Sequence, residues 1–198
     1  MKRATLIDRL ASALDHDPPP AISPGDLGER PAIGGAMVKA AAVLVAITDR
    51  PDPGLILIQR TTSMRFHGGQ VAFPGGRIDP GESVVEAALR EAWEELALAP
   101  TQVRVIGTAD AYHTVTDYLV TPVLGVIAPG LTLVANPAEV ADWFEAPLAH
   151  VLDPANHRRH HAEINGQQRE YWQIIWSDRQ IWGATASMLV NLSHRLAL

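Results

Sequence analysis

Residues 73–98 read FPGGRIDPGESVVEAALREAWEELAL, and this stretch combines a glycine-rich turn with the start of an amphipathic helix. Ser83 is followed three positions later by Glu86, a capping-box pattern that predicts where the helix begins. Apolar residues then recur at helical spacing and form one stripe, which we expect to pack against a core. The stripe consists of Val85, Ala88, Leu89, Ala92 and Leu96.

Three glutamates lie on another face of the same helix. Glu91, Glu94 and Glu95 are three and four positions apart, where like charges repel each other by about 0.2–0.5 kcal/mol per pair. Mg²⁺ prefers oxygen ligands and is commonly held by a few carboxylates together with substrate phosphates. Neighbouring glutamates alone are most often a solvated helix face, so the residues around them decide between the two interpretations.

Those surrounding residues stand at the spacing of a known motif. The stretch resembles the Nudix box, the signature of the Nudix hydrolase superfamily, which runs Gly, five residues, Glu, seven residues, then Arg-Glu-apolar-x-Glu-Glu-x-Gly-apolar. Every charged position matches, and the one departure is Ala97, where the family has a glycine that helps the chain leave the helix. The matching residues are Gly76, Glu82, Arg90, Glu91, Glu94 and Glu95.

The resemblance implies a fold, a reaction and a metal site. The fold is of the α+β class, an α/β/α sandwich with a mixed β-sheet, and the reaction is hydrolysis of a nucleoside diphosphate linked to another moiety. Glu91, Glu94 and Glu95 would hold one to three Mg²⁺ or Mn²⁺ ions, with the carbonyl group of Gly75 as an extra ligand.

The resemblance also implies roles for three further residues. Arg90 would pair with Glu82 and Glu91 and fix the orientation of these two carboxylates. Glu91 is the first candidate for activating the attacking water. Glu139, in the stretch NPAEVADWFEAPL, is the alternative base or a further metal ligand, although a solvated loop acid is an equally good interpretation.

The residues just upstream narrow the expected substrate. The stretch ILIQRTTSMRFHGGQVAFPGG, residues 56–76, resembles the motif of the coenzyme A subfamily, with departures that include Gln59 for Lys and Thr61 for Ser. The stretch GATASML, which follows Ile181 and Trp182, also resembles the C-terminal segment of that subfamily. Coenzyme A carries a diphosphate and a 3′-phosphate, which cations would bind. The candidate substrate-binding residues are Arg60, Arg65, His67, Gly69 and Arg77.

We therefore expect a metal-dependent coenzyme A diphosphatase that yields 3′,5′-ADP and 4′-phosphopantetheine, with acyl-coenzyme A as a further substrate. One alternative keeps the chemistry and changes the substrate to ADP-ribose, a dinucleotide or a nucleoside triphosphate. The other alternative is a Nudix module that senses a nucleotide without turnover. The polar run HRRHH, residues 157–161, is interpreted as a solvated loop, with a contact to the 3′-phosphate left open.

Composition excludes several other classes of protein. The chain has 198 residues, and 47% of them are hydrophobic, enough to build a core. Its formal net charge of −6 makes it a poor candidate for general nucleic-acid binding, which needs a basic face. The absence of cysteine excludes disulfides, thiol nucleophiles and cysteine-bound metals. The longest apolar run, residues 40–47, is too short to span a membrane. We expect a cytoplasmic protein, with a homodimer left open.

The chain is expected to have two parts. Residues 1–36 would form a short amphipathic helix, marked by Leu6, Ile7, Leu10 and Leu14, followed by an extended arm rich in proline and glycine. Residues 37–198 would form the hydrolase domain. Its predicted strands cover residues 38–48, 54–60, 103–114, 118–128 and 139–148, and its predicted helices cover residues 84–98 and 184–196.

Overall fold

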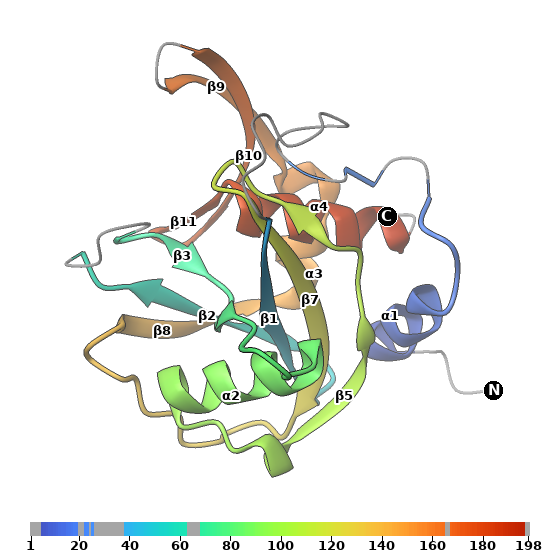
Figure 1. The fold of residues 1–198 in the computed structure, drawn as a ribbon. Coiled ribbons are helices and arrows are strands. Elements are labelled where there is room, and N and C mark those ends of the chain that lie inside the picture. Colours follow the sequence, from blue (N-terminus) through green and yellow to red (C-terminus); the bar gives the residue numbers. More distant parts are fainter. Residues whose placement is uncertain are drawn as a thin grey trace.

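The computed structural model describes residues 5–19, 22, 23, 25, 38–62, 68–164 and 167–196, and at 162–164 and 167–169 it describes the backbone alone. Most of the arm predicted for residues 1–36 therefore lies outside the described residues, as do Arg65 and His67. The described residues form an α/β/α sandwich around a mixed sheet, which confirms the predicted fold class (Figure 1).

The central sheet has the strand order β3-β2-β1-β7-β5, and β4 lies beside β1, β6 beside β7 and β8 beside β2. Strands β1 and β7 are parallel, and the other pairs are antiparallel, so the sheet is mixed. The strands are β1 (Lys39–Thr48), β2 (Gly54–Arg60), β3 (Val71–Ala72), β4 (Gly75–Arg77), β5 (Val103–Thr108), β6 (Tyr112–His113), β7 (Tyr118–Ile127) and β8 (Val140–Pro147).

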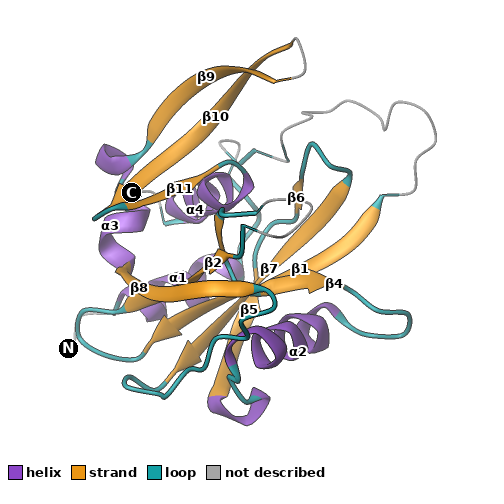
Figure 2. Ribbon diagram, turned by 90° about the vertical axis from the view of Figure 1, so that its left-hand side faces the viewer, coloured by secondary structure: helices purple, strands orange, loops and turns teal. Residues whose placement is uncertain are grey.

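Helices cover both faces of this sheet (Figure 2). Helix α2 (Val84–Leu96) packs on one face, and α1 (Leu6–Leu14), α3 (Leu148–Leu152) and α4 (Ala184–Arg195) pack on the other. Short 3₁₀ turns cover Pro100–Gln102 and Pro154–Asn156. Strand β1 contributes to both cores because its side chains alternate between the faces, with Leu44 on the α2 side and Val45 on the other.

A second, smaller sheet projects past the central one (Figures 1 and 2). It consists of β9 (Arg158–Ile164), β10 (Gln167–Trp176) and β11 (Arg179–Trp182), all antiparallel. The prediction of a solvated loop at residues 157–161 is therefore wrong, because residues 158–161 belong to β9. The guanidinium of Arg159 lies 4.4 Å from the ring of Trp172, and His160 stacks on Tyr171. Aromatic partners on β10 thus stabilise a strand whose own sequence is polar.

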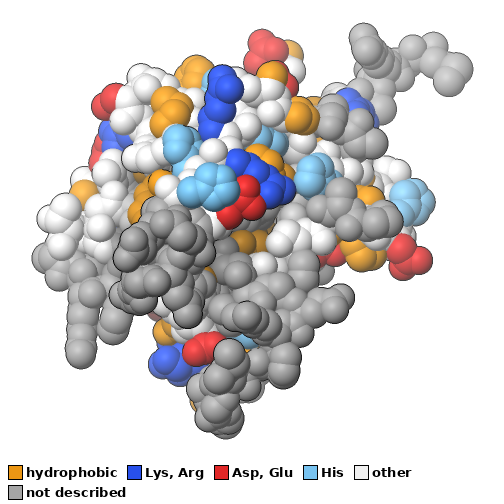
Figure 3. Space-filling view, turned by 90° about the horizontal axis from the view of Figure 1, so that it is seen from above, with side chains coloured by type: hydrophobic (Ala, Val, Ile, Leu, Met, Phe, Trp, Pro, Cys, Tyr) orange, Lys and Arg blue, Asp and Glu red, His pale blue; other side chains and the backbone are white. Residues whose placement is uncertain are grey.

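Charged and histidine side chains gather on the upper face of the molecule, which carries this sheet (Figure 3). There Arg159 pairs with Glu170 at 2.6 Å, and the imidazole of His161 lies 3.9 Å from the same carboxylate. One other prediction also needed correction, because residues 103–114 form two strands, β5 and β6, rather than one. The elements β3, β4, α3, β10 and β11 were not anticipated.

Helix α2 begins where its sequence suggests and ends at Leu96, two residues before the predicted end. The hydroxyl of Ser83 accepts a hydrogen bond from the backbone N–H of Glu86, and the Glu86 carboxylate accepts one from Ser83 N–H, which completes the capping box. The predicted stripe is only partly correct, because Val85 and Leu89 are half-buried. The most buried positions of the helix are Ala87, Ala88, Ala92, Glu95 and Leu96. One of the three glutamates is therefore buried among apolar residues.

Helix α4 is tied to the N-terminal helix by Arg195. This guanidinium donates two hydrogen bonds to the carboxylate of Asp110, at 2.6 and 2.7 Å. It also donates to the backbone carbonyl groups of Ala13 and His16, at the end of α1. A single buried cation thus joins α4, α1 and the segment between β5 and β6.

Candidate active site

The turn before α2 brings the backbone against the sheet and against the acidic face of the helix. Gly75 lies in β4, which pairs with β1, and its φ of 156° is one that residues with a side chain rarely adopt. A Cβ atom there would lie 2.4 Å from the carbonyl oxygen of Ala42. Because the position is a glycine, its N–H can donate a 2.9 Å hydrogen bond to Oε2 of Glu95.

Glu95 is an almost fully buried acid, with a relative exposure of 1%. Its second oxygen, Oε1, accepts no hydrogen bond from any residue that the structure describes. Among the described residues, the cation beside this oxygen is Arg60, whose Nη1 lies 3.7 Å away. Burial raises the pKa of Glu95 to about 8, and the bond from Gly75 and the charge of Arg60 only partly oppose this shift. Among the described residues, these two partners only partly stabilise the negative charge of Glu95.

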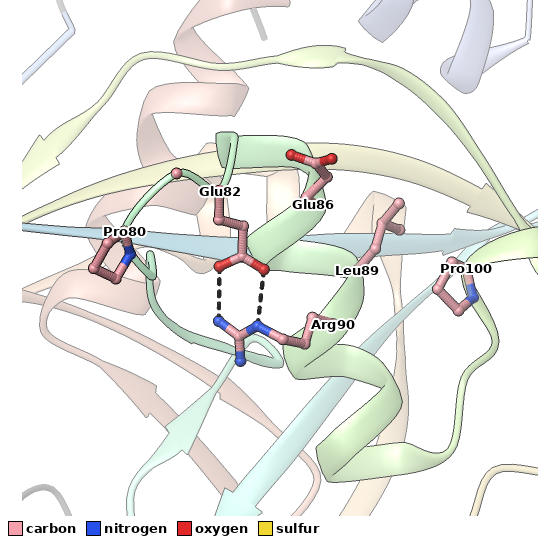
Figure 4. Close-up of a pocket in the computed structure, with 7 residues that line it drawn as sticks. Pro80, Glu82, Glu86, Leu89, Arg90 and Pro100 are labelled. Carbon is pink, nitrogen blue, oxygen red and sulfur yellow. Dashed lines mark hydrogen bonds and ion pairs between the residues drawn. The ribbon is translucent and has the colours of Figure 1, made fainter.

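Arg90 is hydrogen-bonded to three of the other acids, and Figure 4 shows its pair with Glu82. Its Nε and Nη2 donate to the two oxygens of Glu82 at 2.8 and 3.0 Å, the bidentate geometry that a guanidinium favours. Its Nη1 donates to Glu91 at 2.9 Å and to Glu94 at 3.1 Å, and Nη2 also donates to the carbonyl oxygen of Arg77. The expected pairing of Arg90 with Glu82 and Glu91 is thus present, with Glu94 added.

The two carboxylates closest to Arg90 have opposite pKa shifts. The hydrogen bond from Arg90 lowers the pKa of Glu82, with help from the N–H of Asp79. Burial instead raises the pKa of Glu91, although Arg90 opposes this effect. Glu91 and Glu95 are therefore the carboxylates of this cluster whose negative charge is least stabilised by the protein.

Glu139 reaches the same region from the loop between β7 and β8. Its N–H donates to the carbonyl oxygen of Asn136, whose own N–H donates to the carbonyl oxygen of Glu95. Its carbonyl oxygen accepts a 3.0 Å hydrogen bond from the N–H of Thr61. The negative charge of Glu139 contributes to the raised pKa values of both Glu91 and Glu95. The loop thus holds a fourth acid near the acids of α2.

The donor set fits a hard divalent cation. Glu95 has a buried carboxylate oxygen without a hydrogen-bond partner among the described residues, and Glu91 is a largely buried acid beside it. Within the described ranges, however, no three acidic or histidine side chains converge in the spacing of a metal site. The side chains do not converge because Glu91 and Glu94 are hydrogen-bonded to Arg90, whereas Glu95 accepts a hydrogen bond from Gly75. Binding a cation would require Glu94, which is half-exposed, to turn away from Arg90.

The candidate substrate-binding residues fall into three groups. Arg60 lies against Glu95, inside the acidic site, and Arg77 is exposed beside Arg90. Gly69 occupies a turn with φ of 75° at the end of the segment between β2 and β3. Arg65 and His67 lie outside the described residues. Sequence spacing missed the salt bridge between Arg60 and Glu95, since the two positions belong to different elements.

A shallow pocket lies on the outer side of the Arg90–Glu82 pair (Figure 4). Its lining combines three charged side chains with three apolar ones. This pocket is separate from the buried oxygen of Glu95, so it is the outside of the acidic cluster. Its lining residues are Pro80, Gly81, Glu82, Glu86, Leu89, Arg90 and Pro100.

The sandwich fold and the clustered acids define a hydrolase of phosphate anhydrides, and comparison with known proteins agrees. The model of the NUDIX domain matches residues 38–165, which is more than half of the chain. The chain therefore belongs to the Nudix family, and it is a Nudix hydrolase that acts on nucleoside diphosphate derivatives. Hydrolases of this family generally use divalent metal cations.

Two relatives are named uncharacterized Nudix hydrolase NudL. The protein from Escherichia coli O7:K1 is 42% identical over 161 residues, which cover 81% of this chain and 84% of the relative. The protein from Shigella boydii serotype 4 has the same identity and coverage. Identity over this length extends well beyond the acidic helix.

Solved structures support the same fold. The Nudix hydrolase RenU from M. smegmatis is 26% identical, with a TM-score of 0.50 over 58% of this chain and 73% of that chain. A MutT/nudix family protein from Enterococcus faecalis is 15% identical, with a TM-score of 0.50 over 98% of this chain and 70% of that one, and it supports the fold alone. In the described part of the chain, no helix has the length and apolar character needed to span a membrane.

Proposed function

We propose that this hydrolase cleaves the diphosphate of coenzyme A, and of acyl-coenzyme A, to 3′,5′-ADP and 4′-phosphopantetheine with Mg²⁺ or Mn²⁺. The metal requirement rests on one observation above all, the buried Oε1 of Glu95, which lacks a hydrogen-bond partner within the described residues. The choice of coenzyme A rests on the motif of residues 56–76 and on Arg60, which stands beside the acidic cluster.

Different residues of the chain have different roles in the proposed reaction. Glu91, Glu94 and Glu95, with the carbonyl group of Gly75, would hold the cations. A bound divalent ion supplies Lewis-acid polarisation of phosphate oxygens and lowers the pKa of a water molecule. Arg90 cannot bind a cation, so it orients Glu82 and Glu91 through the hydrogen bonds described above.

Two carboxylates compete for the role of general base. Burial raises the pKa of Glu91, which moves this group toward the range in which a base can take a proton near neutral pH. Glu139 lies in a loop that is anchored to the ends of α2 and β2, so it can approach substrate without disturbing the helix. We favour Glu91 as the base, with Glu139 as a further metal ligand or as the alternative base.

Substrate contacts would come from the segment that links β2 to α2. Arg60, Arg77 and the turn at Gly69 are candidates among the described residues, and Arg65 and His67 complete the predicted set. We also infer that residues 37–198 form the catalytic domain, because the family match begins at residue 38. A cytoplasmic location, an N-terminal arm of residues 1–36 and a homodimer are further parts of this proposal.

The test is a substrate panel. Purified protein is incubated with coenzyme A, ADP-ribose, NADH and dGTP, with Mg²⁺, with Mn²⁺ or with EDTA, and the products are identified by mass. We expect release of 3′,5′-ADP from coenzyme A at a rate well above that of the other compounds, and EDTA should abolish it. Glu94→Gln and Glu95→Gln should each reduce kcat by a factor on the order of 100 or more while the protein stays folded.

Other outcomes identify the alternatives. Preferred cleavage of ADP-ribose, NADH or dGTP would keep the metal chemistry and overturn the choice of coenzyme A. Tight binding of coenzyme A without hydrolysis in either metal would indicate a nucleotide-sensing module. Near-normal rates in both Gln variants would contradict the assignment of the metal ligands.

A further inference from the structure

Arg179 of β11 reaches across from the small sheet to the central sheet. Its Nη2 donates to Oδ2 of Asp142 in β8 at 2.6 Å, and its Nη1 donates to Oε1 of Gln59 in β2. The guanidinium also lies 5.1 Å from the centre of the Phe144 ring. Three strands from two sheets thus meet at one cation, which is about three-quarters buried.

The contact with Arg179 fixes the orientation of the Gln59 amide. A guanidinium can only donate hydrogen bonds, so the amide oxygen must face Arg179 and the amide nitrogen must point the other way. That nitrogen, Nε2, donates a 3.1 Å hydrogen bond to the carbonyl oxygen of Gly69. Arg179 therefore acts on Gly69 through Gln59.

Gly69 and Arg60 are linked in turn. The N–H of Gly69 donates to the carbonyl oxygen of Arg60 at 3.1 Å, and the N–H of Arg60 donates to the carbonyl oxygen of Gln70 at 3.0 Å. The positive φ of Gly69 is what lets the chain turn at this point. Arg60 then extends toward Glu95 in the acidic site. The turn at Gly69 thus helps to set the position of the Arg60 backbone.

We propose that Arg179 is a positioning residue for the hydrolase reaction, because it orients Gln59 so that the turn at Gly69 holds Arg60 in the active site. This inference rests on the proposed function in one respect, the roles of Arg60 and Gly69 in binding substrate. It does not depend on which nucleoside diphosphate derivative is the substrate.

Removal of Arg179 should distinguish a positioning role of this residue from a purely structural one. Asp142 is half-exposed, so water can solvate its carboxylate when Arg179 is removed, and the fold should survive. The chain also offers a matched control, because Arg50 pairs with Glu145 of the same strand β8 at 2.8 Å, at the opposite end of the pairing between β2 and β8. Arg50→Met removes a comparable ion pair far from Gly69.

Four variants separate the steps of this chain of contacts. Arg179→Met removes the cation. Gln59→Glu keeps an acceptor for Arg179 but removes the donor to Gly69. Gln59→Lys places two cations against each other. The double variant Gln59→Lys/Arg179→Gln relieves that repulsion and leaves the lysine ammonium free to donate to the carbonyl oxygen of Gly69.

The measurements are kcat and KM on whichever substrate the wild-type protein cleaves best in the panel, together with amide hydrogen exchange over residues 59–72. We expect Arg179→Met, Gln59→Glu and Gln59→Lys to raise KM by roughly five- to tenfold with kcat within about threefold of wild type. Exchange should accelerate at the amides of Arg60 and Gly69. The double variant should return KM to within about threefold of wild type, and Arg50→Met should change neither quantity.

The inference is overturned if Arg179→Met leaves KM and the exchange of both amides unchanged. It is equally overturned if Gln59→Glu behaves like wild type, since the bond to Gly69 would then have no effect. Cleavage of a substrate other than coenzyme A leaves this test intact. If the wild-type protein cleaves none of the compounds, the exchange measurement alone decides, so failure of the proposed function and failure of this inference give different results.

Discussion

The backbone of Gly76 and the carboxylate of Glu91 are in such close contact that a Cβ atom on Gly76 would lie 2.4 Å from Oε1 of Glu91. The clash would involve the end of a flexible side chain, so Gly76→Ala should fold but displace Glu91. We expect kcat to fall by a factor on the order of 100, with the melting temperature within about 3 °C of wild type. Steady-state kinetics and thermal unfolding check this, and a normal kcat would contradict the importance of Glu91.

Gly75→Ala should behave differently from Gly76→Ala. Its Cβ atom would meet backbone atoms of Ala42 and Val43, at 2.4 and 2.6 Å, and these cannot move without disturbing β1. We expect this variant to lose stability or to fail to fold. Equal stability of the two alanine variants would show that the backbone contact at Gly75 is not restrictive.

The burial of Glu95 predicts a pH dependence of stability in the metal-free protein. Its pKa is raised from 4.5 to about 8, so the folded state retains a proton that the unfolded state releases. The free energy of unfolding should therefore fall as pH rises from 4.5 to about 8 and then level off. Glu95→Gln should lack this contribution and should be more stable than wild type at pH 8, by on the order of a few kcal/mol.

Added metal should reverse the order of stability at pH 8. Mg²⁺ or Mn²⁺ that binds the folded state of the wild-type protein raises its melting temperature by mass action. Glu95→Gln should show little of this increase, because it lacks the buried carboxylate. Denaturant titrations at pH 6 and pH 8 check the pH dependence of the free energy of unfolding. Thermal unfolding with EDTA or with metal checks the change in melting temperature. A flat pH profile for both proteins would indicate that Glu95 titrates at an ordinary pKa.

Ala97 ends α2 in a left-handed conformation, with φ of 54°, at the position where the Nudix motif has glycine. A side chain at such a helix end costs about 1 kcal/mol relative to glycine. Ala97→Gly should therefore raise the melting temperature by about 2–4 °C with no change in kcat. The control is Ala99→Gly, two residues later and at φ of −61°, which should lower stability because it only adds freedom to the unfolded chain. If Ala97→Gly lowered the melting temperature and Ala99→Gly raised it, the result would contradict backbone strain at Ala97.

Substitution of Arg195 should greatly lower the stability of the fold without changing the catalytic activity. Its side chain is 7% exposed and that of Asp110 is 17% exposed, so Arg195→Ala leaves a partly buried carboxylate without its partner. Breaking such a pair costs about 3–5 kcal/mol, and we expect a fall in melting temperature on the order of 10 °C. Arg195→Lys should lose less because it keeps the charge. Thermal unfolding distinguishes the two, and equal losses would show that the charge contributes little.

Local signals were sufficient to predict most of the central sandwich. The continuous apolar run of β1 and the capping box at Ser83 are properties of neighbouring residues, so the sequence reveals them directly. Strands β3 and β4 have two and three residues, too few for a period to show. Strand β9 was missed for another reason, because its polar side chains depend on Trp172 and Tyr171 of β10 for packing.

The site shows the same division between local and distant contacts. The pairing of Arg90 with Glu82 and Glu91 was predicted because the resemblance to the Nudix motif implies it. The contacts of Arg60 with Glu95 and of Arg179 with Gln59 could not be predicted, since the second pair is separated by 120 positions. Contacts of this kind depend on how elements far apart in the sequence pack together, which no local pattern encodes.

The parallel pairing of β1 with β7 has a consequence for how the protein is made. It joins residues on the order of 80 positions apart, a separation that slows folding because a long loop must close first. Gly75, Arg90 and the acidic face of α2, formed by Glu91, Glu94 and Glu95, all lie within that loop. During synthesis on a ribosome, the acidic helix therefore emerges well before the strand that completes the sheet behind it. The nascent chain can assemble its hydrolytic site only after Ile127 has left the exit tunnel.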